Sequence, residues 1–297
     1  MKGKAMIEYD SVQKLVDTAQ KAGMNISDIV LKDQAHQLGR DPQELFKEMH
    51  MQLEVMNEAV RKGLESGMKS ASGLSGGDAV KMKQAVDEDR SISGRILGGA
   101  LARALAVTEV NACMGRIVAA PTAGSCGIIP AVLITLREEK KLPEDKIVMS
   151  LFTAAGIGTV IAKRASISGA EGGCQAECGS ASAMAAAAAV EIMGGTPQMA
   201  AHACAMALKG VLGLVCDPVA GLVEVPCIKR NAMGAANSLA SAEMALAGIE
   251  SVIPADEVID AMKSVGDTMP SALKETAEGG LAATPTGLRI ARDILGN

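Results

Sequence analysis

The chain has 297 residues, enough for one large domain or two smaller ones, and 34 acidic against 29 basic residues give it a net charge of −5. No basic block stands out, and two Phe, one Tyr and no Trp leave no platform on which bases could stack. A nucleic-acid partner is therefore not expected.

Small and flexible side chains dominate the apolar part of the composition, which makes up 48% of the chain and includes 18 Met. Small residues let helices approach closely and Met fills irregular gaps, whereas strands prefer aromatic and β-branched residues. The composition predicts an all-α fold, a single large helical domain with long glycine- and proline-rich loops. Residues 1–66 are expected to form peripheral helices and residues 95–297 a hydrophobic core.

The N-terminal part contains signals for ordinary amphipathic helices. Ser11 can cap a helix over residues 12–22, and Gly23 can end it. Asp41 followed by Pro42 predicts the start of a second helix. Along that helix, one apolar face that we assign to the core contains Met49, Leu53, Met56 and Val60.

Residues 67–78 are rich in Gly and Ser and predict a loop. Such a run is commonly a linker. It is equally compatible with an active-site loop whose free backbone N–H groups hold an anion.

After residue 95 the charges become sparse and the helical pattern continues. Helices are predicted at residues 95–111, 130–139, 147–162, 178–193, 197–212, 232–249 and 255–264. Asp256 and Ser271 are plausible helix caps, and residues 222–228 have the pattern of an extended strand. The turns between these helices fall at residues 119–130, 164–174, 213–230 and 279–287.

Two uncharged stretches, residues 117–136 and 147–162, raise the question of a membrane span. The first contains Pro121 and Pro130, which would break a spanning helix, and the second is short. We interpret both as buried elements of a soluble protein. The N-terminus lacks the apolar core of a signal peptide, and seven Cys without an export signal indicate reduced thiols in the cytoplasm.

Three cysteines, Cys174, Cys216 and Cys227, lie in turns marked by Gly and Pro. Their long spacings fit neither a disulfide framework nor the short paired spacings of structural zinc. Three thiolates from separate loops are compatible with an iron–sulfur cluster that keeps one corner open. Buried structural cysteine is the alternative, and it is the interpretation we give to Cys113 and Cys204.

Four segments resemble the iron–sulfur L-serine dehydratases: residues 120–130, 166–177, 216–231 and 279–287. The resemblance covers nearly the whole chain and is most specific from residue 115 onward. The length of the chain and its end at Asn297 resemble the separate alpha subunit of the two-chain form.

The resemblance implies a lyase that converts L-serine to pyruvate and ammonia with a [4Fe-4S] cluster acting as a Lewis acid and without pyridoxal phosphate. It places the three cluster ligands at Cys174, Cys216 and Cys227. Cys178 falls where relatives often carry Val and is not assigned as a ligand. A separate beta subunit is implied, so a hetero-oligomer is expected, with a homodimer as the alternative for the isolated chain.

The family's substrate segments match further positions in this chain. The substrate-binding residues implied by the resemblance are Thr122, Gly124, Ser166, Ser168 and Gly169. Ala123 stands where many relatives carry Asn, so a side-chain contact from that position is lost. Single-chain members end in a cysteine that reaches the cluster, and this chain has no such tail.

The base that removes the α-proton is not fixed by the sequence. Glu171 and His202 are the candidates, although a loop contact for Glu171 and a core or capping role for His202 are the plainer interpretations. The base can also come from the beta part, which carries a Ser-His-Thr motif in the family. Lys163 and Arg164 could attract the carboxylate of serine, or lie solvated at a helix end.

Two other functions stay open at this point. A related iron–sulfur lyase could act on L-cysteine and expel sulfide. A non-catalytic metal-binding scaffold or a membrane-associated module is the alternative outside the enzymes.

Overall fold

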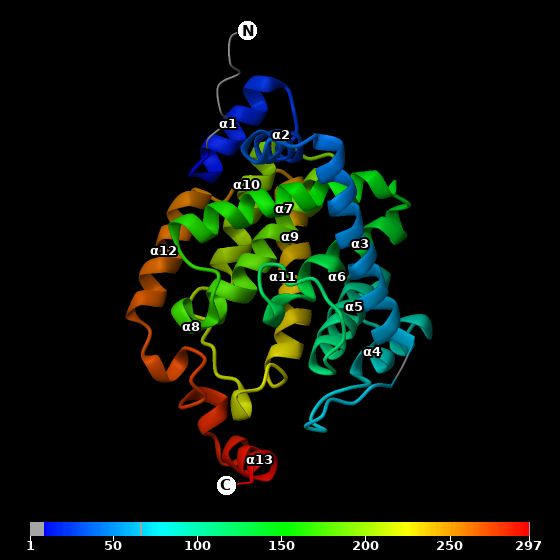
Figure 1. Cartoon of the computed structure of the whole chain (residues 1–297), viewed down its shortest axis with the longest axis vertical. Helices are drawn as coiled ribbons and strands as arrows, with labels where there is room; N and C mark the ends of the chain where they lie inside the picture. The colour runs from blue at the N-terminus through cyan, green and yellow to red at the C-terminus, as the bar shows by residue number, and fades with distance from the viewer. Residues whose placement is uncertain (1–8, 66, 297) are drawn as a thin grey trace.

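A computed structural model describes residues 9–65 and 67–296, and helices account for all the regular structure in those ranges (Figure 1). The N-terminal half contains α1 (Val12–Ala22), α2 (Ile26–Leu38), α3 (Pro42–Glu65), α4 (Asp78–Asp87), α5 (Gly94–Ala112), α6 (Ile128–Lys140) and α7 (Glu144–Arg164). The C-terminal half contains α8 (Gly169–Gly172), α9 (Ser180–Ile192), α10 (Pro197–Lys209), α11 (Cys227–Leu246), α12 (Ala255–Thr268) and α13 (Pro285–Leu295). The predicted all-α class is confirmed.

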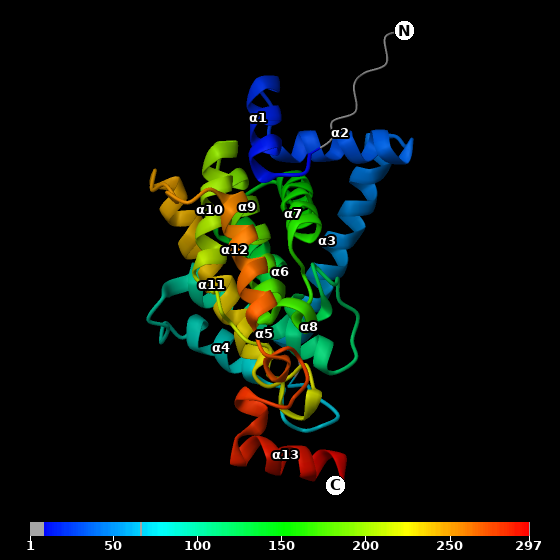
Figure 2. The ribbon, with the colours of Figure 1, turned by 90° about the vertical axis from the view of Figure 1, so that its left-hand side faces the viewer.

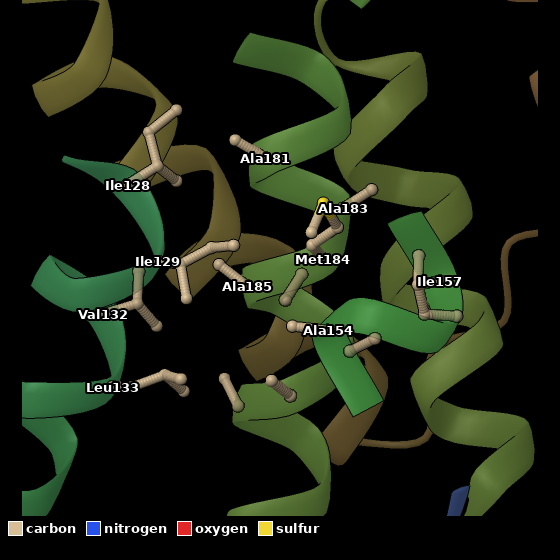
Figure 3. Close-up of a cluster of buried hydrophobic side chains, with 14 of the residues drawn as sticks. Ile128, Ile129, Val132, Leu133, Ala154, Ile157, Ala181, Ala183, Met184 and Ala185 are labelled. Carbon is tan, nitrogen blue, oxygen red and sulfur yellow. The ribbon is translucent and has the colours of Figure 1, made fainter. Parts of the chain in front are cut away.

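Helix α9 is the centre of the bundle. Every residue of α9 except Glu191 is buried, and the helix packs against α6, α7, α10 and α11. Its run of Ala presents little side-chain volume, so four neighbours can approach it closely. Figure 3 shows part of this core, with Ile128, Ile129, Val132 and Leu133 from α6, Ala154 and Ile157 from α7, and Ala181, Ala183, Met184 and Ala185 from α9.

Two glycines lie where helices cross without room for a larger side chain. A methyl group added at Gly63 of α3 would overlap the backbone carbonyl of Ala106 in α5. A methyl group added at Gly158 of α7 would meet only the flexible thioether of Met184, whose Cε atom would be 2.8 Å away. The α3–α5 contact therefore depends on glycine more strictly than the α7–α9 contact.

Local signals predicted α1 well. The structure departs from prediction where contacts between residues far apart in the sequence determine the backbone conformation. Ser11 caps α1 by accepting the Lys14 N–H, and Gly23 ends it with φ of 62°. Four helices, α2, α4, α8 and α13, were not predicted individually. The predicted strand at 222–228 is wrong: a 3-10 turn precedes it, Pro226 follows a cis peptide bond, and α11 already begins at Cys227. Proline lacks the N–H that a ladder needs, and the described residues offer no neighbouring strand there.

The cap assigned to Asp256 is also wrong. Helix α12 begins after Pro254, and the Asp256 carboxylate instead accepts the N–H groups of Val12 at 2.8 Å and Gln13 at 3.0 Å. Asp256 thus caps α1, a helix from the other end of the chain. Ser271 starts a 3-10 turn and makes no side-chain capping bond.

Two further helices receive their N-terminal cap from a distant carboxylate. Glu191 of α9 accepts the Ser27 N–H at the start of α2, at 3.3 Å. Glu109 of α5 accepts the N–H groups of Gly77 and Asp78 at the start of α4, at 3.1 and 2.8 Å. Free N–H groups at a helix start attract negative charge, so the half-buried Glu191 and the buried Glu109 join separate helices into one unit.

Helix α7 is long and apolar enough to cross a membrane, but 61% of its most apolar window is buried inside the bundle. That burial is typical of a core helix in a soluble protein. The predicted absence of a signal peptide concerns residues 1–10, of which 1–8 lie outside the described residues.

The loops that carry the predicted ligands gather towards one end of the bundle, away from α1 and α2 (Figures 1 and 2). Helix α8, the loop before α11 and the chain after α12 meet there in both views. The Cys216 N–H donates to the Leu273 carbonyl at 2.9 Å, and the Glu275 N–H donates to the Cys216 carbonyl at 2.8 Å. The chain after α12 therefore holds the Cys216 loop on both sides.

Candidate metal and substrate site

Cys174 lies at a sharp change in backbone direction. Gly173 before it has φ of 75°, and a π-helical turn, Gln175–Gly179, follows it. The buried Gln175 side chain fixes this turn by donating to the Met262 carbonyl at 3.0 Å and accepting the Gly213 N–H at 2.9 Å. Such π turns occur frequently at functional sites.

The three predicted ligand cysteines come together. Cys216 is 3% exposed, and its Sγ atom lies 3.0 Å from the position that a Cβ atom on Gly169 would occupy. Cys227 is the first residue of α11. Burial and then the nearby Cys174 raise the pKa of the Cys216 thiol, and the same two causes raise the pKa of Cys227 to about 12. Cys174 therefore lies close enough to the buried Cys216 and the half-buried Cys227 to influence both thiols.

Cys178 adds a fourth sulfur atom to this region. Its Sγ atom lies 3.3 Å from that of Cys174, and both side chains are buried. The hydrogen bond between them lowers the pKa of Cys174 and raises the pKa of Cys178, and burial raises the latter further. Cys174, Glu177 and Cys178 also place their ligand atoms within 4.8 Å of one another. Because two of these three ligand atoms are soft sulfur donors, the group favours a thiophilic metal.

Arg230 is the positive charge at this site. Its Nη1 atom donates to the Val215 carbonyl and its Nη2 atom pairs with the Asp217 carboxylate, each at 2.8 Å, so it holds both residues that flank Cys216. Burial opposes the charge of Arg230, but Cys174 and Asp217 outweigh it and raise its pKa. The positive charge of Arg230 also lowers the pKa of Cys174. One side chain of α11 therefore binds the Cys216 segment and influences the Cys174 thiol.

Glu177 is a half-buried carboxylate beside the thiols. Thr122 donates a short hydrogen bond to it, and burial, its largest influence, raises the pKa of Glu177 despite that bond. A Cβ atom on Gly124 would lie 2.5 Å from a Glu177 oxygen, and one on Gly169 would lie 3.5 Å from the other. Glycine at both positions leaves room for this carboxylate.

Asn231 fastens the turn at residues 122–126 onto α11. Its side-chain amide donates to the Gly124 carbonyl at 2.7 Å and to the Cys227 carbonyl at 3.0 Å, and its oxygen accepts the Gly127 N–H at 2.9 Å. The predicted substrate turn and the predicted ligand Cys227 are therefore held by the same side chain.

The Gly- and Ser-rich loop at residues 67–78 packs against the loop that precedes Cys227. Glu224 accepts hydrogen bonds from the hydroxyl groups of Ser72, at 2.8 Å, and of Ser75. Asp78 pairs with Lys229 at 2.6 Å. The loop thus belongs to the rim of the site, which favours an active-site role over a linker.

Three predicted residues lie beside the thiols on a neighbouring surface. Ser166 accepts the Ser168 N–H at 3.0 Å. Ser166 and Glu171 line a cavity of about 270 Å3 together with Lys263 and Lys274, and no cysteine lines that cavity. Glu171 is exposed there and precedes Cys174 by three residues.

His202 lies in α10, at a different place in the fold. Its Nδ1 atom accepts the Ser251 N–H at 3.3 Å, and it lines a small cavity with Asp256 and other residues of the α1 and α12 ends. His202 therefore holds the loop between α11 and α12. Lys163 contacts the Tyr9 ring, with Nζ 5.6 Å from the ring centre, and Arg164 pairs with aspartates, so both lie at a helix end as solvated charges do.

Sequence reasoning did not single out Glu177, Arg230 and Asn231. All three lie at the ends of two of the four segments that carry the family resemblance, residues 166–177 and 216–231. A buried charge cannot be distinguished from a surface charge by its letter alone, but its place at the edge of a cysteine motif was an available signal.

Comparison with known proteins supports the same family over nearly the full length of the chain. The family model "Serine dehydratase alpha chain" matches residues 21–282. A Bacillus subtilis protein described as a probable L-serine dehydratase, alpha chain, is 51% identical over 288 residues, 97% of this chain and 96% of the relative. The L-serine dehydratase alpha chain of Peptoniphilus asaccharolyticus is 45% identical over 286 residues, 96% of this chain and 98% of the relative. The L-serine dehydratase 2 of Escherichia coli is 36% identical over 284 residues, which are 92% of this chain but 61% of that longer relative. The chain therefore belongs to the serine dehydratase alpha chain family.

Proposed function

We propose that this chain is the alpha subunit of a cytoplasmic lyase that converts L-serine to pyruvate and ammonia together with a separate beta subunit. The observation that supports the proposal is that Cys174 lies close enough to Cys216 and Cys227 to raise the pKa of both thiols, in a chain of this family. The names of the relatives supply the substrate and the second subunit.

The residues present fit a [4Fe-4S] cluster held by those three cysteines. Thiolates are the donors that such clusters use, and these three come from separate segments near Arg230, which binds the Cys216 segment and influences the Cys174 thiol. Because thiolates at a buried site need a compensating charge, the Arg230 guanidinium is a suitable neighbour.

When bound, the cluster would supply Lewis-acid chemistry toward the substrate hydroxyl, and no pyridoxal phosphate would be needed. The protein must position the serine and take its α-proton. Thr122, Gly124 and Gly169 line the space beside Glu177 and the thiols, so they are proposed to form the substrate wall, with Ser166 and Ser168 next to them. Of the two candidate bases, Glu171 shares a segment with Cys174, whereas His202 lies in another cavity.

The test is anaerobic reconstitution with iron and sulfide, followed by assays of iron content, visible absorbance and pyruvate release. Serine should give pyruvate when the beta subunit is present, and Cys216→Ser should lose both the absorbance and the activity. Cys204→Ser is the matched control, because Cys204 is buried within α10 and contacts no cysteine among the described residues.

The two alternatives have distinct outcomes in the same experiment. If pyruvate and sulfide are released from L-cysteine faster than pyruvate is released from L-serine, L-cysteine is the substrate. A protein that binds iron and sulfide but releases pyruvate from neither amino acid, even with the beta subunit, would be a metal-binding scaffold.

A further inference from the structure

Two cysteine sulfur atoms already lie nearly at bonding distance. The Sγ atoms of Cys174 and Cys178 are 3.3 Å apart, and a disulfide needs about 2.05 Å. The π-helical turn Gln175–Gly179 places them there, because Cys174 directly precedes it, Cys178 is its fourth residue, and Gln175 fixes its backbone. Among the described residues, the hydrogen bonds show no second pair of cysteine sulfur atoms in contact.

We propose that Cys174 and Cys178 are a modification site, at which hydrogen peroxide converts the pair to a reversible disulfide when no cluster is bound. The inference goes beyond the proposed function and does not depend on it, since it needs neither serine nor the beta subunit. It gives a role to Cys178, to which the cluster proposal assigns none.

The chemistry is a two-electron oxidation of two thiols. The Cys174 sulfur attacks one peroxide oxygen, the O–O bond breaks, and the released hydroxide takes the thiol proton to become water. This leaves a sulfenic acid on Cys174. The Cys178 sulfur then attacks the Cys174 sulfur, the S–O bond breaks, and the leaving oxygen takes the Cys178 proton as a second water.

The geometry supplies the resolving thiol. The Cys178 sulfur lies 3.3 Å from the Cys174 sulfur, close enough to attack a sulfenic acid formed there. The disulfide protects Cys174 from further oxidation, and a thiol reductant restores it. Where the cluster proposal holds, the oxidised chain cannot take a cluster until it is reduced.

The experiment maps the bond in the full chain. Cluster-free protein is treated with hydrogen peroxide, its free thiols are alkylated, and a protease that cuts after Glu digests it. Cutting after Glu171, Glu177 and Glu191 separates Cys174 from Cys178. The two peptides should therefore appear joined, at a mass two hydrogens below their sum, and should separate after dithiothreitol treatment.

The variant Cys178→Val and the control Cys113→Ser test the resolving role. Cys113→Ser should behave as the parent chain does, whereas in Cys178→Val the Cys174 peptide should gain oxygen atoms that dithiothreitol does not remove. Joined peptides that contain Cys216 or Cys227 in place of Cys178 would overturn the proposal. So would full recovery of Cys174 in Cys178→Val. Failure of the cluster to assemble in reduced protein would instead count against the proposed function alone.

Discussion

At the scale of single residues, the Arg230 side chain makes the main polar contacts around Cys216. It binds the carbonyl of Val215 and the carboxylate of Asp217, and its own helix begins at Cys227. Its side chain is 16% exposed and that of Asp217 is 4% exposed, so the pair is shielded from water. Breaking a buried pair from one side leaves the other charge uncompensated, which costs far more than losing a surface pair.

Replacing Arg230 with Gln should therefore lower the free energy of unfolding by about 3 kcal/mol. Arg230→Lys should cost less, because an ammonium keeps the charge but cannot reproduce the two-pronged geometry. The measurement is urea unfolding of the cluster-free chain. Lys229→Gln is the matched control, since Lys229 pairs with Asp78 at the surface. An Arg230→Gln midpoint equal to that of Lys229→Gln would contradict the assignment.

At the scale of helices, the fold is joined by close crossings and by carboxylates buried between elements. Glu191 illustrates the second device, because its Oε2 atom accepts both the Ser27 N–H and the Thr153 hydroxyl. Burial raises the pKa of Glu191, and the two hydrogen bonds only partly oppose this. The folded chain therefore binds a proton at Glu191 more tightly than the unfolded chain does.

This binding difference predicts a pH dependence. The free energy of unfolding should fall as the pH rises from the ordinary pKa of Glu, about 4.3, through the raised pKa of Glu191. Above that pH the loss of stability should stay constant. Glu191→Gln keeps an oxygen for both hydrogen bonds and has no charge to bury. It should be more stable than the parent chain at pH 8, and the difference should shrink toward pH 4.5. Urea unfolding across this range checks it, with the exposed Glu243→Gln as the control, which should show no such trend.

The close helix crossings predict different effects on stability when a methyl group is added at Gly63 and at Gly158. Gly63→Ala gains helix propensity but drives a methyl group into the Ala106 backbone, so a net loss of about 1–2 kcal/mol is expected. Gly158→Ala meets only the flexible end of Met184 and should be neutral or stabilising by up to about 1 kcal/mol. Thermal unfolding of the two variants side by side distinguishes them. Equal midpoints would mean that α3 and α5 can move apart at no cost.

At the scale of the whole molecule, the site is assembled from segments that are distant in the chain. The loop at residues 67–78 reaches the Cys216–Cys227 region through Glu224, which holds Ser72 and Ser75. The end of the loop is held separately, by Glu109 at Gly77 and Asp78 and by Lys229 at Asp78, so Glu224 should control the opening of the part around Ser72 and Ser75.

Glu224→Ala should therefore expose the loop to trypsin at Lys69, with cleavage several-fold faster than in the parent chain. The rate of appearance of the two fragments at native conditions measures this. Lys229→Gln, which removes a different contact of the same region, should cleave more slowly than Glu224→Ala. Unchanged cleavage in Glu224→Ala would show that other contacts hold the loop.

Sequence reasoning succeeded where the deciding contacts are local or lie inside a motif. Helix α1 was predicted with its bounds because Ser11 and Gly23 act within one turn of it. It failed at residues 222–228, where a β-like pattern is overridden by a cis Val225–Pro226 bond. It also failed at Asp256, whose partner is 244 residues away. The cysteines were found through their motif, but the side-chain directions that bring Arg230 to them are tertiary and have no local signal.

The bond between Asp256 and Val12 has a consequence during translation. A ribosome adds about 5–20 residues per second, so the 244 residues between the two take roughly 12 to 50 s to synthesise. For all that time the nascent first helix has emerged without its second cap. Chaperones that bind exposed amphipathic segments therefore have a long interval in which to act on α1, and its final docking belongs to the last stage of synthesis.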